Sequence, residues 1–161
     1  MAEFKFPTEE VELPSKGLVY PKENPLSSGK VEMKYMTAKE EDILTNQSYI
    51  QKGIVLDKLL KSLIIDKNVK VDDLVIGDKN SLLVGCRILG YGKDYEFQYG
   101  GETHVIDLSV LENKPFDESS IEQGKNEFSF TIPSNGSKLI YKLLTGKDEK
   151  TIDREINGLK K

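Results

Sequence analysis

The sequence is poor in the residues that build redox and metal chemistry: its 161 residues include one cysteine, one histidine and no tryptophan. The single cysteine, Cys86, excludes an internal disulfide and a thiolate metal cluster, which suits a reducing compartment. No run approaches the roughly 18 apolar residues of a membrane span. The amino-terminal stretch has no basic region followed by a long apolar run, so we expect neither a membrane anchor nor a secretory leader.

Catalytic patterns are missing as well. A nucleophile–base pair would need His104 with a serine or with Cys86, and nothing near these residues in the sequence supports one. The phosphate-binding motifs GxxxxGK[ST] and GxGxxG do not occur. His104 has no second histidine or cysteine beside it, which argues against a bound metal. We therefore predict no enzyme, no cofactor and no metal site, with a small hydrolase that uses His104 as the remaining alternative.

The charge pattern limits the partners. Lysine and arginine number 23 against 27 acidic residues, giving a formal net charge of −4, and the two signs are interleaved along the chain. Nucleic-acid binding requires clustered positive charge, so nucleic acid is not an expected partner. Charged residues make up 31% and hydrophobic residues 37%, a balance typical of a folded domain with a core.

The first 26 residues contain four of the six prolines and show little periodicity. Because proline prevents regular helix and interrupts a central strand, we predict an extended proline-rich arm over 1–26, followed by a single compact α+β domain over 27–161. The arm either lies on the protein's own core or docks on another subunit. In the second case deleting residues 1–21 should leave a folded domain, and the binding residues would be Phe4, Phe6, Leu13, Leu18 and Tyr20.

An alternating segment followed by a capped helix begins at about residue 29. Val31, Met33 and Tyr35 alternate with polar residues, as in a half-buried strand. Thr37 and Glu40 have the spacing of a capping box, in which each side chain bonds the other's backbone N–H. We expect the helix that starts there to end near residue 46.

A similar pattern occurs 108 residues later. The segment 138–144 fits either a strand or a helix by periodicity alone, and the parallel with the first copy favours a strand. Thr145 and Asp148 then occupy the positions of Thr37 and Glu40, with a helix expected to about residue 157. Two copies of one strand–capped-helix unit are therefore predicted.

Two helices are expected between the copies. Leucines and isoleucines recur at helical spacing over 54–65. A second apolar helix over 79–89 is predicted to begin at Asp78 as N-cap and to be the central buried one, with Cys86 as a small core residue.

A β-hairpin is predicted over 95–108, because two glycines at 100–101 supply the positive φ angles of a tight turn. Three aromatic residues alternate on its first strand, Tyr95, Phe97 and Tyr99. Since an isolated two-stranded hairpin is marginal in water, we expect these side chains to contact the protein's own core or a partner. The segment 112–126 that follows is predicted to be an acidic, solvated loop.

Five segments in a fixed order carry a resemblance to a known family: LPSKGLVYP, MTAKEEDIL, VDDLVIGDKNSLLVGCRILGYGKDYEF, HVIDLS and LLTGKDEK. Over about residues 11–152 the chain resembles the baseplate hub assembly proteins of T-even-type contractile-tailed bacteriophages. The resemblance implies a virion protein of the tail baseplate, assembled in the host cytoplasm and placed near hub subunits and the tape-measure protein. Some relatives carry cysteine pairs at the hairpin tip, where this chain has Tyr99-Gly100-Gly101-Glu102, so no zinc is expected here.

The prediction is thus an α+β fold in which a duplicated strand–capped-helix unit surrounds two central helices and a β-hairpin. The functional hypothesis is a structural or assembly subunit of the baseplate hub that acts through contacts with other tail proteins, with an oligomer within the baseplate left open. The alternative is a transient tail-assembly chaperone that is absent from the mature virion.

Overall fold

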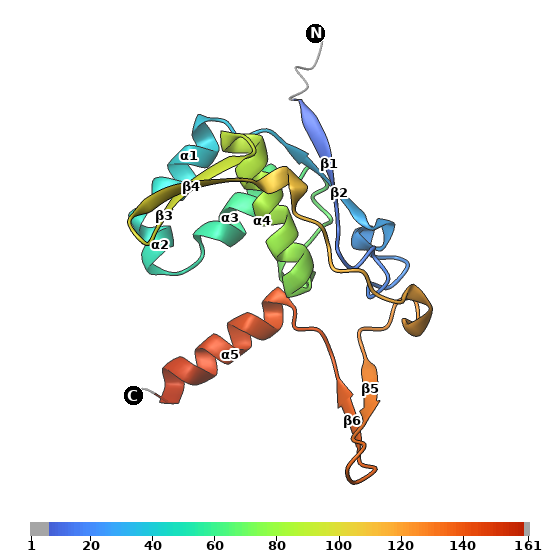
Figure 1. The fold of residues 1–161 in the computed structure, drawn as a ribbon. Coiled ribbons are helices and arrows are strands. Elements are labelled where there is room, and N and C mark those ends of the chain that lie inside the picture. The colour runs from blue at the N-terminus through green and yellow to red at the C-terminus, as the bar shows by residue number, and fades with distance from the viewer. Residues whose placement is uncertain (1–6, 160–161) are drawn as a thin grey trace.

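The first strand, β1 (Thr8–Glu12), pairs antiparallel with β2 (Lys30–Lys34) and joins the amino-terminal segment to the body of the protein. The computed structural model describes residues 7–159, and the predicted contact residues Phe4 and Phe6 lie outside them. Within residues 7–159 the fold is α+β, as predicted, with five α-helices and three separate two-stranded antiparallel sheets (Figure 1). The α-helices and the other strands are α1 (Ala38–Thr45), α2 (Gln47–Gln51), α3 (Val55–Leu63), α4 (Ile76–Tyr91), β3 (Asp94–Tyr99), β4 (Glu102–Asp107), β5 (Phe128–Thr131), β6 (Lys138–Tyr141) and α5 (Gly146–Leu159).

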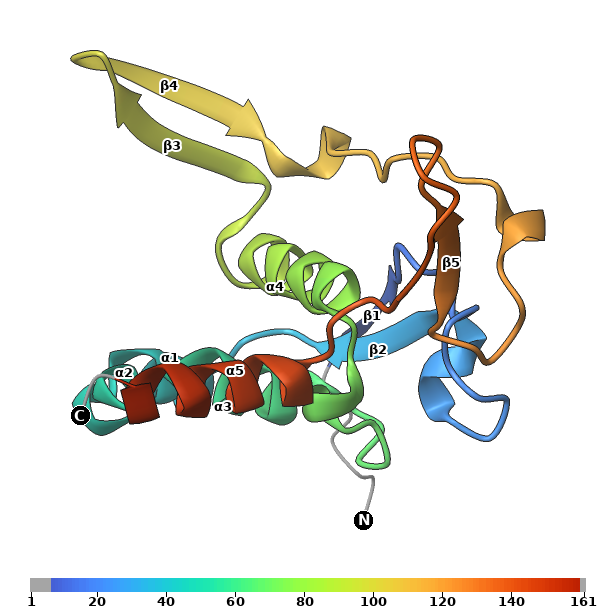
Figure 2. The ribbon, with the colours of Figure 1, turned by 90° about the horizontal axis from the view of Figure 1, so that it is seen from below.

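The hydrophobic core lies between the β1–β2 sheet, α3 and α4 (Figures 1 and 2). Met33 from β2, Leu60 and Leu63 from α3, and Leu82 from α4 are completely buried. Burial of side chains of this size contributes about 2 kcal/mol each, so these contacts account for much of the stability of the fold. The hairpins β3–β4 and β5–β6 and the helix α5 extend outward from this core (Figures 1 and 2).

The arm predicted as a separate segment is part of the same core. Leu13, Val19 and Tyr20 are 2–4% exposed, and Leu18 is half-buried. The interpretation of Leu13 and Tyr20 as partner-binding residues is therefore wrong, because their side chains pack inside the protein. Gly17 (φ 76°) allows the close approach of this turn to the next one, since a Cβ there would lie 2.5 Å from the Ser27 carbonyl oxygen.

The two predicted central helices are present with shifted boundaries. The helix α3 buries Leu59, Leu60 and Leu63, whereas Leu56, expected on the same face, is 44% exposed. The helix α4 begins at Ile76, three residues earlier than predicted. Asp78 is therefore not its N-cap, and its buried carboxylate faces the amino-terminal segment instead. Only one face of α4 is fully buried, although nearly all of its faces are apolar.

Both threonines of the repeated pattern stand at strand-to-helix junctions. The Thr37 N–H and hydroxyl donate to one oxygen of Glu40, at 3.0 and 2.6 Å. The Thr145 N–H and hydroxyl donate in the same way to one oxygen of Asp148, at 2.9 and 2.8 Å, and the Asp148 N–H donates to the Thr145 hydroxyl at 3.4 Å. Residues 138–141 form a strand, so the strand prediction is correct and the helical alternative is wrong.

The surroundings of the two junctions differ. In β2, Val31 and Met33 are buried, whereas all four residues of β6 are exposed. Tyr35, the third residue of the first alternating pattern, lies beyond the end of β2 and is 37% exposed. The local hydrogen bonds are alike, but descent of the two units from one duplicated segment stays a prediction.

Glu40 is a buried carboxylate that ties α1 to its neighbours. Its side chain has no exposed surface and accepts hydrogen bonds from Lys34 (2.8 Å), Thr37 and the Ser62 hydroxyl of α3. Burial alone would raise the pKa of Glu40, but the hydrogen bonds from Lys34, Ser62 and Thr37 together outweigh it and lower the pKa to about 2. The carboxylate is therefore held charged in the folded protein.

The substitution Glu40→Gln is expected to cost about 3 kcal/mol of unfolding free energy at pH 7, because the folded pKa lies well below the ordinary value of 4.5. A lowered folded pKa stabilises the protein above pH 4.5, and this contribution disappears as the pH falls toward 2. Urea unfolding at pH 7, 5 and 3 should show the difference between the variant and the wild type shrinking with pH. Glu41→Gln, at an exposed neighbour, is the control. If Glu40→Gln lowers the unfolding free energy by the same amount at pH 7 and at pH 3, the fold does not hold the Glu40 carboxylate in its charged form.

Candidate protein-binding site

Three of the predicted contact residues lie together on β3. The register pairs Tyr95 with Ile106, Phe97 with His104 and Tyr99 with Glu102, and a glycine turn at 100–101 joins the strands as predicted. Alternation therefore places the three aromatic side chains on one face of the hairpin together with His104 and Ile106. Tyr95, Phe97 and Tyr99 are 42%, 37% and 76% exposed.

The rings on this face form a continuous aromatic row. The centroids of Tyr95 and Phe97 are 6.2 Å apart, those of Phe97 and His104 5.5 Å, and those of Tyr99 and His104 6.3 Å. At the base of the hairpin the Arg87 guanidinium lies 5.6 Å from the Tyr95 ring and donates to the carbonyl oxygens of residues 92 and 94. The row is thus fixed at its base by α4 and exposed at its tip.

A second apolar face lies on the β5–β6 hairpin. Phe128 pairs with Tyr141 and Phe130 with Leu139, so that all four side chains share one face. The rings of Phe128 and Tyr141 stack with centroids 5.5 Å apart. Phe130, Leu139 and Tyr141 are each at least half exposed, whereas Phe128 packs against the core. Sequence reasoning predicted the second of these strands, β6, and did not identify the exposed face of the hairpin as a binding surface.

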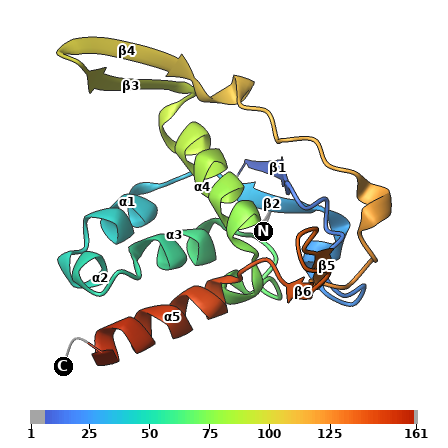
Figure 3. The same ribbon diagram turned by 60° about the horizontal axis from the view of Figure 1, so that its bottom comes forward.

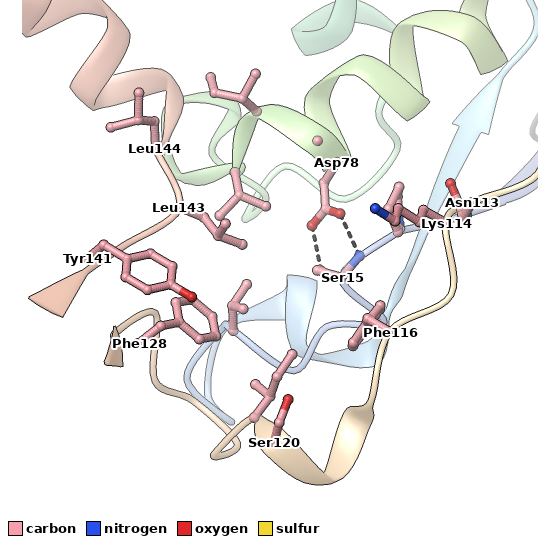
Figure 4. A pocket seen from close by; sticks show the side chains of 16 residues that line it. Ser15, Asp78, Asn113, Lys114, Phe116, Ser120, Phe128, Tyr141, Leu143 and Leu144 are labelled. Atoms are coloured by element: carbon pink, nitrogen blue, oxygen red, sulfur yellow. Dashed lines mark hydrogen bonds between the residues drawn. The ribbon is translucent and has the colours of Figure 1, made fainter. Parts of the chain in front are cut away.

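A cavity of about 520 Å³ opens where this hairpin meets the core. Phe128, Tyr141 and Leu143 line one side of it, and the segment 113–121 that leads from β4 toward β5 lines the other (Figure 4). Val19 and Ile121 add further apolar surface. The segment predicted as a solvated acidic loop therefore also contributes an apolar wall. A cavity of this size and lining suits one or two large apolar side chains.

Ser15 and Asp78 in the cavity wall belong to a buried hydrogen-bond network that also includes Tyr20. Asp78 accepts from the Ser15 N–H (2.9 Å) and the Ser15 hydroxyl (2.6 Å), as Figure 4 shows, and from the Tyr20 hydroxyl (2.6 Å). Tyr20 in turn accepts from the Val75 N–H at 3.0 Å. Burial, and secondarily the charge of Asp78, raises the pKa of Tyr20 far above its usual value, so its hydroxyl remains a donor. The network holds this part of the wall in place, and Val19, Ile121, Phe128 and Leu143 contribute apolar surface to the cavity.

Cys86 lies elsewhere, on the buried face of α4, and is 2% exposed. Burial raises the pKa of its thiol to about 12, so the thiol stays protonated at neutral pH. This agrees with the prediction that it is a small core residue. Within residues 7–159 no group of three or more histidine, cysteine or acidic side chains is placed to hold a metal ion.

Comparisons of the chain with protein-family models, with curated proteins and with solved structures find no match. Among the helices of residues 7–159, none has the length and apolar character needed to cross a bilayer.

Proposed function

We propose that this protein is a structural or assembly subunit of a bacteriophage tail baseplate hub, acting through contacts with hub and tape-measure proteins. The observation that carries the protein-contact part is the pair of hairpins that extend from the core with apolar faces exposed. The sequence resemblance described above supplies the baseplate context.

Exposed apolar hairpins favour a binding role on physical grounds. Two-stranded hairpins are marginally stable alone, and exposed apolar patches of monomers mark sites of interaction. Tyr99 at one tip and Phe130 on the other hairpin are large side chains of the kind that anchor protein interfaces. A partner that covered both faces would bury apolar surface and stabilise the hairpins at once.

Substitution of Tyr99 by Ser is expected to reduce capture of tail proteins by about tenfold or more, because it removes an exposed aromatic anchor. The test is affinity capture with the tagged full-length chain from infected cells, with mass spectrometry of the captured proteins. Gln98→Ser is the matched control, since Gln98 is the adjacent exposed residue on the opposite face of β3. Circular dichroism checks that both variants are folded.

If Tyr99→Ser and Gln98→Ser capture the same proteins equally well, the aromatic row is not the contact surface. If the wild-type chain captures no hub or tape-measure protein, the baseplate assignment itself is wrong. Mass spectrometry of purified tails then separates a permanent subunit, which stays in the particle, from a transient assembly chaperone, which is absent from it.

A further inference from the structure

We infer that the carboxy-terminal helix α5 binds a basic amphipathic helix of another protein. Helix α5 is separate from the two hairpins. The acidic residues beside its exposed apolar side chains indicate the kind of partner that it binds. Among residues 7–159, the helix contacts the body through its first turns, and Figure 3 shows its later turns extending beyond them.

The attachment consists of ion pairs and backbone hydrogen bonds at the first turns. Lys150 contacts Asp57 of α3 at 2.7 Å and Asp72 at 2.5 Å. Glu149 contacts Lys79 of α4 at 3.1 Å, and the Gly146 N–H donates to a carbonyl oxygen at residue 74. Every residue from 151 to 159 is exposed.

The exposed part of α5 carries an apolar stripe. Ile152, Ile156 and Leu159 follow one another at i, i+4 and i+7 and so lie on one face of the helix. They are 41%, 45% and 87% exposed. A helix of this length is only marginally stable in water unless its apolar face packs against other apolar surface. We therefore expect a partner to cover the stripe.

The acidic residues of α5 border the stripe. Asp153 lies three residues before Ile156, and Glu155 lies four residues before Leu159, so both side chains flank the same face. Asp148 and Glu149 lie four and three residues before Ile152, but they pair with Lys142 and Lys79, so Asp153 and Glu155 determine the charge beside the stripe. The three basic residues occupy a separate face at i, i+3 and i+7, namely Lys147, Lys150 and Arg154.

This arrangement selects the partner by charge. In a second copy of α5 packed on the first, Asp153 and Glu155 would face carboxylates in either the parallel or the antiparallel orientation, and like charges at these flanking positions destabilise a helix pair. A helix with an apolar stripe flanked by lysine or arginine would place opposite charges there. The fitting occupant is therefore a basic amphipathic helix and not another copy of this chain.

The experiment uses two synthetic helical peptides of 21 residues with a fluorescent label. Both have leucine at positions a and d of each heptad, and they differ only in lysine or glutamate at positions e and g. The full-length protein is expected to bind the lysine peptide at least tenfold more tightly than the glutamate peptide in fluorescence anisotropy, with binding weakened by added salt. The double substitution Ile152→Ser with Ile156→Ser should reduce binding of the lysine peptide at least tenfold.

A control for general charge attraction uses two double variants with the same change in net charge. Asp153→Lys with Glu155→Lys should reverse the preference between the two peptides. Glu23→Lys with Glu112→Lys, at exposed positions elsewhere, should leave the preference unchanged. If the two double variants behave alike, the binding is nonspecific and the inference is wrong.

A second measurement tests self-association. Sedimentation of the wild type at micromolar concentration should show a monomer. A dimer that the Ile152→Ser, Ile156→Ser variant abolishes would assign the stripe to a second copy of the chain and overturn the inference. Because both experiments use the purified chain and defined peptides, their failure leaves the proposed contacts of the hairpins with tail proteins to be judged separately.

Discussion

Deletion of residues 1–21 is expected to unfold the protein. The deletion removes β1, the only strand paired with β2 within residues 7–159. It also removes Leu13, Val19 and Tyr20 from the core, where each is at most 4% exposed. Burial contributes about 2 kcal/mol for each such side chain, so the loss is comparable with the whole stability of a small domain. Thermal unfolding followed by circular dichroism should show no cooperative transition in the truncated chain.

Two leucines of the same segment provide the matched comparison. Leu13→Ala is expected to cost about 3 kcal/mol, because Leu13 is 2% exposed and its removal leaves a cavity. Leu18→Ala should cost clearly less, since Leu18 is only half-buried. A truncated chain that unfolds cooperatively near the wild-type temperature would show that residues 1–21 form a separable arm after all.

Features determined by neighbouring residues were predictable from the sequence. The glycine pair at 100–101 set the position of the β3–β4 turn, because only positive φ angles close so short a hairpin. Thr37 and Thr145 marked the start of α1 and α5 because a hydroxyl and a carboxylate three residues apart satisfy the first backbone groups of a helix. In both cases the partners lie within a few residues along the chain.

Features that depend on distant residues were not predictable in this way. The prolines of the first 26 residues indicated irregular backbone, which is compatible with either a free arm or a buried one. Which of the two forms depends on contacts such as that of Ser15 with Asp78, 63 residues away. The short helix α2 had no strong apolar periodicity to indicate it.

The alternation of apolar and polar residues correctly predicted the strands β2 and β6, but it did not predict which of them is buried. The same period-2 pattern occurs in β2, where Val31 and Met33 are buried, and in β6, where Leu139 and Tyr141 are half exposed. A period of two shows only that one face is apolar. Whether that face meets the core or a partner is decided by the tertiary arrangement, which is why the exposed β5–β6 face and the cavity beside it were missed.

The carboxylate of Asp78, in the wall of the cavity, is buried and accepts three hydrogen bonds. It holds the amino-terminal turn through Ser15 and Tyr20, and its place in the first turn of α4 is favourable for a negative charge. Substitution by alanine would leave two hydroxyl donors and one backbone N–H without their acceptor in a buried setting. The network therefore connects the segment 13–20 to α4 more strongly than any surface ion pair would.

Asp78→Ala is accordingly expected to lower the unfolding free energy by about 4 kcal/mol, measured by guanidinium chloride unfolding at pH 7. Tyr20→Phe should cost about 2 kcal/mol, because it removes two hydrogen bonds of the network and keeps the buried ring. Asp73→Ala, at an exposed carboxylate five residues earlier, is the control and should stay within about 0.5 kcal/mol of the wild type. Equal stabilities for Asp78→Ala and Asp73→Ala would mean that the network does not hold the amino-terminal segment in place.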